Sequence, residues 1–101
     1  MNLFQHAILK LSEECAEVSQ VCSKIMQFGL DSDYQGITNR EQLRKELIDV
    51  LACIEYINQY SDFGFKPRFI DSEISNKIAK IDKYRDISEN LGYVNYDAYK
   101  I

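Results

Sequence analysis

Apolar residues recur in alternating steps of four and three along three separate stretches of this chain. In the first stretch these positions are Phe4, Ile8, Leu11, Cys15, Val18, Cys22 and Ile25. In the second they are Leu43, Leu47, Val50, Ile54 and Ile57, and in the third Ile70, Ile74, Ile78 and Ile81. Such spacing gives each helix one apolar face and is typical of helices that pack together. We therefore expect an all-α fold, a small antiparallel bundle of three main helices that is completed by oligomerisation.

Glycine and capping residues mark where these helices begin and end. Gly29 and Gly92 follow the first and third stretches, and glycine is common just past a helix. Thr38 and Glu41 have the spacing of a capping box, which predicts that the second helix begins near Asn39. The expected helices span about 2–28, 39–60 and 69–90, and a tyrosine-rich tail follows at 91–101. At 101 residues, the whole chain (1–101) is expected to form a single domain.

Charge and composition exclude several classes of protein. The net charge of −4 argues against binding to a nucleic-acid polymer, which needs a basic surface. No apolar run is long enough to cross a membrane, and the first residues lack the pattern of a signal peptide. The three cysteines, Cys15, Cys22 and Cys53, cannot all pair, and we expect them to be reduced thiols in the core. A cytoplasmic location is therefore expected.

Two matched pairs of acidic residues lie on the first two expected helices. Glu14 and Glu17 form the first pair, Glu46 and Asp49 form the second, and 28 residues separate the pairs. Residues three apart lie on one side of a helix. Each acid directly precedes a residue of the apolar row, so both pairs occupy the same shoulder of that row, heptad positions g and c. If the helices pack antiparallel, as a short connection favours, the two shoulders face each other across a shallow groove.

Four carboxylates that meet in this way predict a divalent cation. Without one they would repel each other and raise each other's pKa. Magnesium takes oxygen ligands and shares its shell with substrate phosphates, where it can activate water and neutralise charge. The alternative is that the acids are solvated residues beside an apolar row, which is common on amphipathic helices. The matched register of the two pairs leaves both interpretations open.

The same shoulder of the third expected helix is basic, with Lys77 before Ile78 and Lys80 before Ile81. This arrangement fits a site with a metal at one end and phosphate at the other, although the sequence does not bring the three shoulders together. Four aromatic residues near expected helix ends could stack on a nucleobase, but packing in the core is the favoured role. They are Phe28, Tyr34, Phe63 and Phe65.

The two acidic segments resemble the signature of the MazG-like all-α nucleoside triphosphate pyrophosphohydrolases. The first segment is L-S-E-E-C-A-E-V, the second is L-R-K-E-L-I-D-V-L-A, and the resemblance covers roughly residues 3–85. The resemblance implies a catalytic centre that binds Mg²⁺, or Mn²⁺ in its place, through Glu14, Glu17, Glu46 and Asp49. It also implies that basic residues of the third helix contact phosphate, which points to Lys77, Lys80 and Arg85.

The resemblance further implies an activity and an assembly. The activity is hydrolysis of a nucleoside triphosphate, or a related nucleotide, between the α and β phosphates to give a monophosphate and pyrophosphate. The assembly is a homodimer or homotetramer, because so short a helical unit leaves apolar faces uncovered. Two alternatives remain, a module that binds a nucleotide without hydrolysis and a purely structural helical oligomer.

Overall fold

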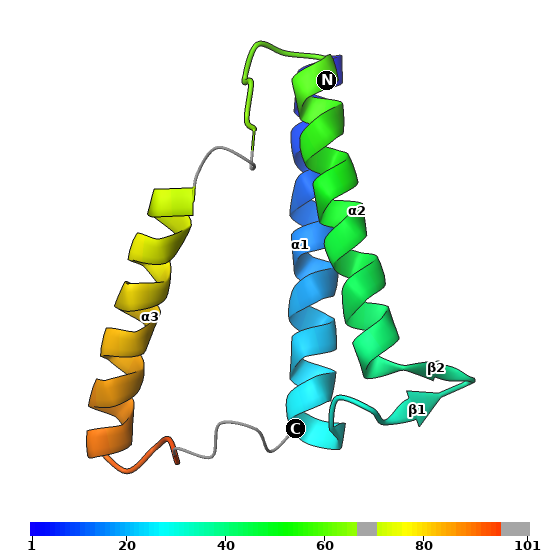
Figure 1. Ribbon diagram of the computed structural model, residues 1–101. Coiled ribbons are helices and arrows are strands. Elements are labelled where there is room, and N and C mark those ends of the chain that lie inside the picture. The colour runs from blue at the N-terminus through cyan, green and yellow to red at the C-terminus, as the bar shows by residue number, and fades with distance from the viewer. Residues whose placement is uncertain (67–70, 96–101) are drawn as a thin grey trace. The chain divides into compact units, whose positions relative to one another are not determined.

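The computed structural model describes residues 1–66 and 71–95, and most of them are helical (Figure 1). The helices are α1 (Leu3–Phe28), α2 (Asn39–Gln59) and α3 (Asp71–Asn90). The mostly helical fold expected from the apolar spacing is confirmed. Residues 69 and 70, predicted to open the third helix, and residues 96–101 of the predicted tail lie outside the described residues.

The contacts of the chain divide it into two compact units. Met1–Phe65 contains α1 and α2, and Lys66–Ile101 contains α3. The expected single domain and three-helix bundle therefore stay predictions. None of the helices in the described residues is both long and apolar enough to span a membrane.

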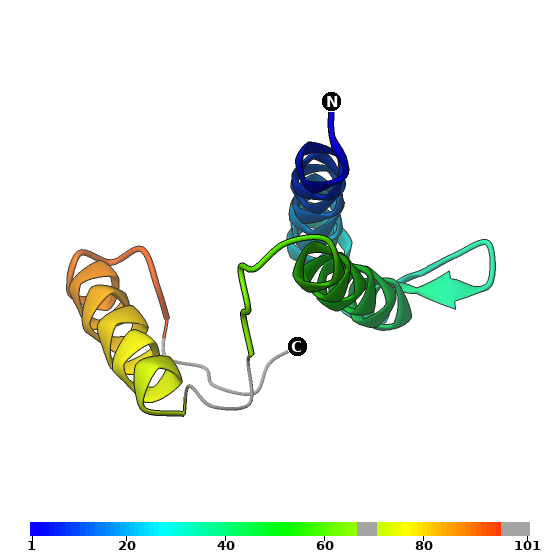
Figure 2. The same ribbon diagram turned by 90° about the horizontal axis from the view of Figure 1, so that it is seen from above.

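In the first unit, α1 and α2 lie side by side and run antiparallel (Figures 1 and 2). Ala7 and Val21 of α1 and Ile57 of α2 are buried between them. Near the beginning of α1, the ring of His6 meets the ring of Tyr56 edge to face, with centroids 6.3 Å apart. Because one helix advances as the other returns, residues early in α1 face residues late in α2.

The face of α1 that packs against the rest of its unit is not the face that the sequence predicted, but one rotated from it about the helix axis. The least exposed positions of its central part are Ala7, Leu11, Glu14, Val18, Val21 and Ile25. Phe4, Ile8, Cys15 and Cys22 of the predicted row are exposed, so the expectation of core thiols is wrong for these two cysteines. Both rows share Leu11, Val18 and Ile25 and both have steps of four and three, so spacing alone could not choose between them.

Several apolar side chains expected in a core are uncovered in their own unit. Leu47, Ile48 and Leu51 of α2 are exposed, and Leu47 belongs to the apolar row predicted for this helix. Exposed isoleucines of the predicted row also lie on α3, at Ile74, Ile78 and Ile81, and Ile70 lies outside the described residues. These residues form exposed apolar faces on α2 and α3.

A two-stranded hairpin joins α1 to α2, in the segment between the first two expected helices. Its strands are β1 (Asp33–Tyr34) and β2 (Ile37–Thr38), which pair antiparallel. The two residues of the turn, Gln35 and Gly36, have φ of 55° and 85°. Two successive positive φ values are the mark of a type I′ turn, whose twist suits a hairpin.

Side-chain hydrogen bonds hold both ends of this connection. Arg40 of α2 donates to both carboxylate oxygens of Asp31, at 2.9 and 3.1 Å. The side-chain amide of Asn39 donates a hydrogen bond to the backbone oxygen of Gly29, just past α1, at 2.9 Å. Thr38 Oγ1 accepts a hydrogen bond from the Glu41 backbone N–H at 3.2 Å, one of the two bonds expected from the capping box. The hairpin is therefore fixed to the helices that flank it.

Replacing Gln35 with glycine is expected to raise the free energy of unfolding by about 0.5–1 kcal/mol. A side chain with a Cβ is strained at positive φ, and this relief exceeds the extra chain entropy that glycine loses on folding. Urea denaturation followed by circular dichroism measures the change. The matched control is Gln20→Gly in the middle of α1, which should lower stability by about 1 kcal/mol. A loss of stability in Gln35→Gly would contradict the assigned turn.

Candidate metal centre

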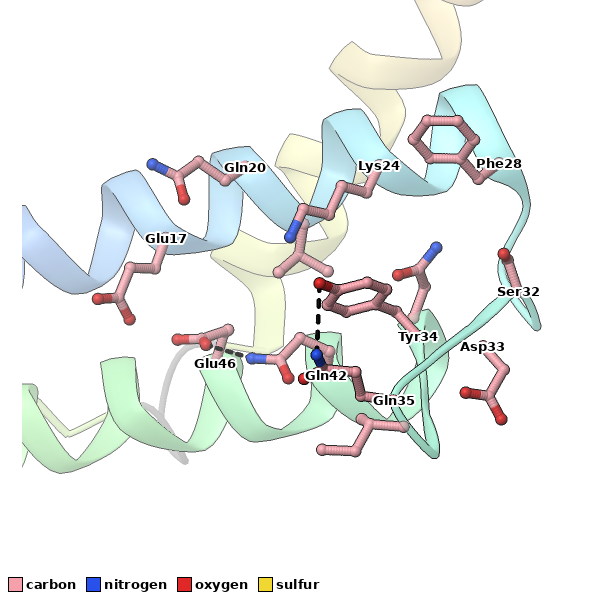
Figure 3. Close-up of a pocket in the computed structure, with 13 residues that line it drawn as sticks. Glu17, Gln20, Lys24, Phe28, Ser32, Asp33, Tyr34, Gln35, Gln42 and Glu46 are labelled. Atoms are coloured by element: carbon pink, nitrogen blue, oxygen red, sulfur yellow. Dashed lines mark hydrogen bonds between the residues drawn. The ribbon is translucent and has the colours of Figure 1, made fainter.

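Four carboxylates meet between α1 and α2. One oxygen from each of Glu14, Glu17, Glu46 and Asp49 lies within 4.8 Å of the other three. Figure 3 shows the carboxylates of Glu17 and Glu46 pointing toward each other from the two helices. Opposite ligands of a magnesium ion are about 4.2 Å apart, twice the usual bond length, so four such oxygens need little movement to surround one ion.

Three of the four acids are at least partly buried. Glu46 is only 7% exposed, and Glu14 and Asp49 are half-buried, whereas Glu17 is exposed. Both pairs were predicted to lie beside the apolar row, and for Glu14 this is wrong, because the packed face of α1 is turned and Glu14 is itself part of the packed row. Burying charged groups is costly unless they are paired or hold a metal.

Two of the buried oxygens lack a hydrogen-bond donor. Glu14 Oε2 and Glu46 Oε2 accept no hydrogen bond from residues 1–66 or 71–95. Glu46 Oε1 accepts one from the Gln42 side-chain amide, at 2.6 Å. Buried polar atoms are normally satisfied, and a cation would satisfy both orphaned oxygens. A set of four carboxylates suits Mg²⁺ or Mn²⁺, which prefer oxygen ligands.

Without a cation, the site opposes the ionisation of Glu46. Burial is the largest cause and raises the pKa of Glu46. The neighbouring Glu17 carboxyl, with which Glu46 can share a proton, raises this pKa further, and so does the charge of Asp49. The hydrogen bond from Gln42 acts the other way and lowers the pKa. A divalent ion among the oxygens would favour the ionised form and so reverse the net effect.

The basic residues predicted to contact phosphate lie on α3, in the other unit. Lys77 and Lys80 are exposed. Arg85 forms ion pairs with Asp82 at 3.4 Å and Asp86 at 3.2 Å. Because these residues belong to a different unit from the acids, their role as phosphate ligands stays a prediction.

The sequence did not single out two further residues, one in contact with an acid and one in the cavity that two of the acids line. Gln42, one helical turn before Glu46, binds its carboxylate, and Lys24, two turns after Glu17, lines the same cavity as Glu17 and Glu46. The cavity measures about 870 Å³ and opens between α1, the hairpin and the first turns of α2 (Figure 3). The signal that could have found both residues is their helical spacing from the acids.

The predicted core packing of the aromatic residues is wrong for three of the four. Tyr34 is 75% exposed and Phe28 is 66% exposed, and both line the cavity beside the acids. Phe63, near the end of α2, is 64% exposed, whereas Phe65 is half-buried. The aromatic rings near the hairpin therefore face a cavity.

Comparison of this chain with protein families, with characterised proteins and with solved structures finds no match.

Magnesium is expected to stabilise the folded protein, because an ion held by four carboxylates binds the folded state only. At a free concentration one hundred times Kd, the free energy of unfolding should rise by about 2.7 kcal/mol. Thermal unfolding with and without Mg²⁺ measures the effect. Glu46→Gln should remove most of this stabilisation, whereas Glu55→Gln, at an exposed position of α2, should keep it. Equal stabilisation of both variants would exclude the site.

In metal-free protein, Glu46 is expected to cost stability as the pH rises. Its pKa is raised in the folded state, so its contribution is most favourable below the ordinary value of 4.5 and is lost as the pH rises through the raised pKa. Glu46→Gln should therefore melt higher than the wild type at neutral pH in a chelator, and the difference should shrink as the pH approaches 4.5. A constant difference across this range would contradict the assigned pKa shift.

Proposed function

We propose that this protein is a magnesium-dependent nucleotide pyrophosphohydrolase that converts a nucleoside triphosphate, or a related nucleotide, into a monophosphate and pyrophosphate. The observation that carries the proposal is the convergence of Glu14, Glu17, Glu46 and Asp49 around one point. These four acids come from the two segments that resemble the MazG-like signature. Their orphaned buried oxygens give the cluster a need for a cation that solvated acids lack.

In this proposal the four carboxylates hold Mg²⁺, with Mn²⁺ as the substitute. The bound ion would supply charge neutralisation at the phosphates and a lower pKa for water. Glu17 and Glu46 line the cavity, so a phosphate chain reaches the acids from that side. Glu17 is the most exposed of the four and is best placed to accept the proton of the attacking water. Water bonds to phosphorus as the bridging P–O bond breaks, and pyrophosphate leaves.

The assembly we propose is a homodimer or homotetramer in the cytoplasm. The exposed apolar residues of α2, Leu47, Ile48 and Leu51, give a second copy a surface to cover. Thiols such as Cys15 and Cys22 are exposed and remain reduced in that compartment. Binding to a nucleic-acid polymer or to a membrane is not part of the proposal.

A panel of nucleoside triphosphates is expected to release pyrophosphate in the presence of Mg²⁺ and not in a chelator. Glu46→Gln should lower kcat/KM by about 100-fold or more, since removing one charged group from such a site costs several kcal/mol. The Glu55→Gln variant should keep wild-type activity. Circular dichroism of both variants checks that the fold is intact.

The same panel separates this proposal from its alternatives. Nucleotides that raise the melting temperature in Mg²⁺ without any product would select a binding module. A panel that neither turns over nor stabilises the protein would leave the structural oligomer.

The assembly is tested by sedimentation velocity. The wild type should sediment as a species larger than one chain of 101 residues. Leu51→Glu introduces a charge at an apolar position that is 56% exposed, and it should shift the protein to monomer. Gln59→Glu, at an exposed position of the same helix, should not. A monomeric wild type would contradict the assembly.

A further inference from the structure

The cavity beside the acids extends from the metal centre to the hairpin. Glu17 and Glu46 line one end, and Tyr34 and Gln35 of the hairpin line the other. Lys24 of α1 lies between them, about 10 Å along the helix from Glu17 at 1.5 Å per residue. The volume of about 870 Å³ lies within the range of pockets that bind small molecules.

Polar and charged side chains are frequent among the residues that line this cavity. Nine of its thirteen residues have polar or charged side chains other than tyrosine: Glu17, Gln20, Lys24, Ser32, Asp33, Gln35, Asn39, Gln42 and Glu46. Four of the nine are amides, which offer donors and acceptors together, as a nucleobase edge requires.

Aromatic rings lie on the hairpin side of the cavity. Tyr34 is 75% exposed, and Figure 3 shows its ring among the lining residues, with its hydroxyl accepting a hydrogen bond from the Gln35 amide at 3.5 Å. Phe28, in the last turn of α1, also lines the cavity and is 66% exposed. Every nucleobase has a flat face that can stack on such a ring.

Gln35, at the tip of the hairpin, has a backbone conformation that is unfavourable for a residue with a Cβ atom. Gln35 has φ of 55°, where glycine or asparagine would be less strained. Glutamine nevertheless occupies the position, and its side chain lines the cavity. Strain that persists on the wall of a cavity is a reason to look for a function of the side chain.

Lys24 is the one cationic residue among those that line the cavity. No carboxylate within residues 1–66 or 71–95 forms an ion pair with it. Figure 3 shows its ammonium on the side of the cavity toward Glu17. A lysine in this position suits a phosphate that lies between the metal and a base.

We propose that the β1–β2 hairpin is the element that recognises the base of the nucleotide. The base and sugar occupy the cavity under the hairpin, Tyr34 stacks on the base, and the Gln35 amide binds its edge. Lys24 contacts the phosphate nearest the sugar. The direction of the ligand, with its phosphates toward the acids, rests on the proposed function.

The test uses isothermal titration calorimetry in Mg²⁺ with the 5′-monophosphates of adenosine, cytidine, guanosine and uridine, and with inorganic pyrophosphate. Tyr34→Ala and Gln35→Gly should each weaken the tightest-binding monophosphate by about tenfold. Both should leave pyrophosphate binding within about twofold of wild type. Phe63→Ala removes a similarly exposed ring at the opposite end of the unit and should change neither. Unchanged monophosphate binding in Tyr34→Ala, or no binding of any monophosphate by the wild type, would overturn the proposal.

A second pair of variants tests the position of Lys24. Lys24→Gln should weaken the same monophosphate by about tenfold and leave the corresponding uncharged nucleoside unaffected. Lys45→Gln removes an equal charge from an exposed position outside the cavity lining and should change neither ligand. Equal losses in the two variants would show a general effect of net charge and would contradict a contact from Lys24.

The outcomes also separate this inference from the proposed function. If monophosphate binding depends on Tyr34 but the protein hydrolyses no nucleotide, base recognition by the hairpin is supported and the hydrolase function is rejected. If Tyr34→Ala hydrolyses a nucleotide in Mg²⁺ with an unchanged KM, the hydrolase function is supported and base recognition by the hairpin is rejected. Circular dichroism and the melting temperature show whether each variant is folded.

Discussion

Mutual repulsion of four carboxylates in a helix interface is the constraint on which this site depends. Glu46 is buried, and the orphaned oxygens of Glu14 and Glu46 receive no donor from the described chain. A helix pair optimised only for stability would place apolar side chains there. The interface therefore gives up stability in the metal-free state, and the binding of a cation would recover it.

The sequence predicted the helices well because their spacing is a local property. It also predicted which four acids meet. A separation of three places each pair on one side of its helix, and antiparallel packing of α1 and α2 then brings the two pairs together. It did not predict which side of α1 packs. Leu11 and Val18 belong to both possible rows, and the choice depends on contacts with α2, such as the burial of Ala7 and Val21.

The hairpin and its cavity could not be predicted from local patterns. The turn lacks the Asn-Gly or Asp-Gly pair that marks most two-residue hairpins, and Gln35 is an uncommon residue at positive φ. The cavity arises from three segments that no single motif contains. The exposure of Tyr34 follows from its place on that hairpin, whereas composition alone favoured a core residue.

Two contacts anchor the hairpin, the Arg40–Asp31 ion pair and the Asn39–Gly29 hydrogen bond. They separate the shape of the cavity mouth, which the hairpin sets, from the position of the acids, which the helices set. Both anchors lie at helix ends, whereas the acids lie two or more helical turns from those ends. Insertions or exchanges between positions 31 and 38 could therefore reshape the mouth of the cavity while the four clustered carboxylates keep their places. A hairpin that can change while the helix pair is kept would allow related proteins to evolve different ligand preferences on the same pair of helices.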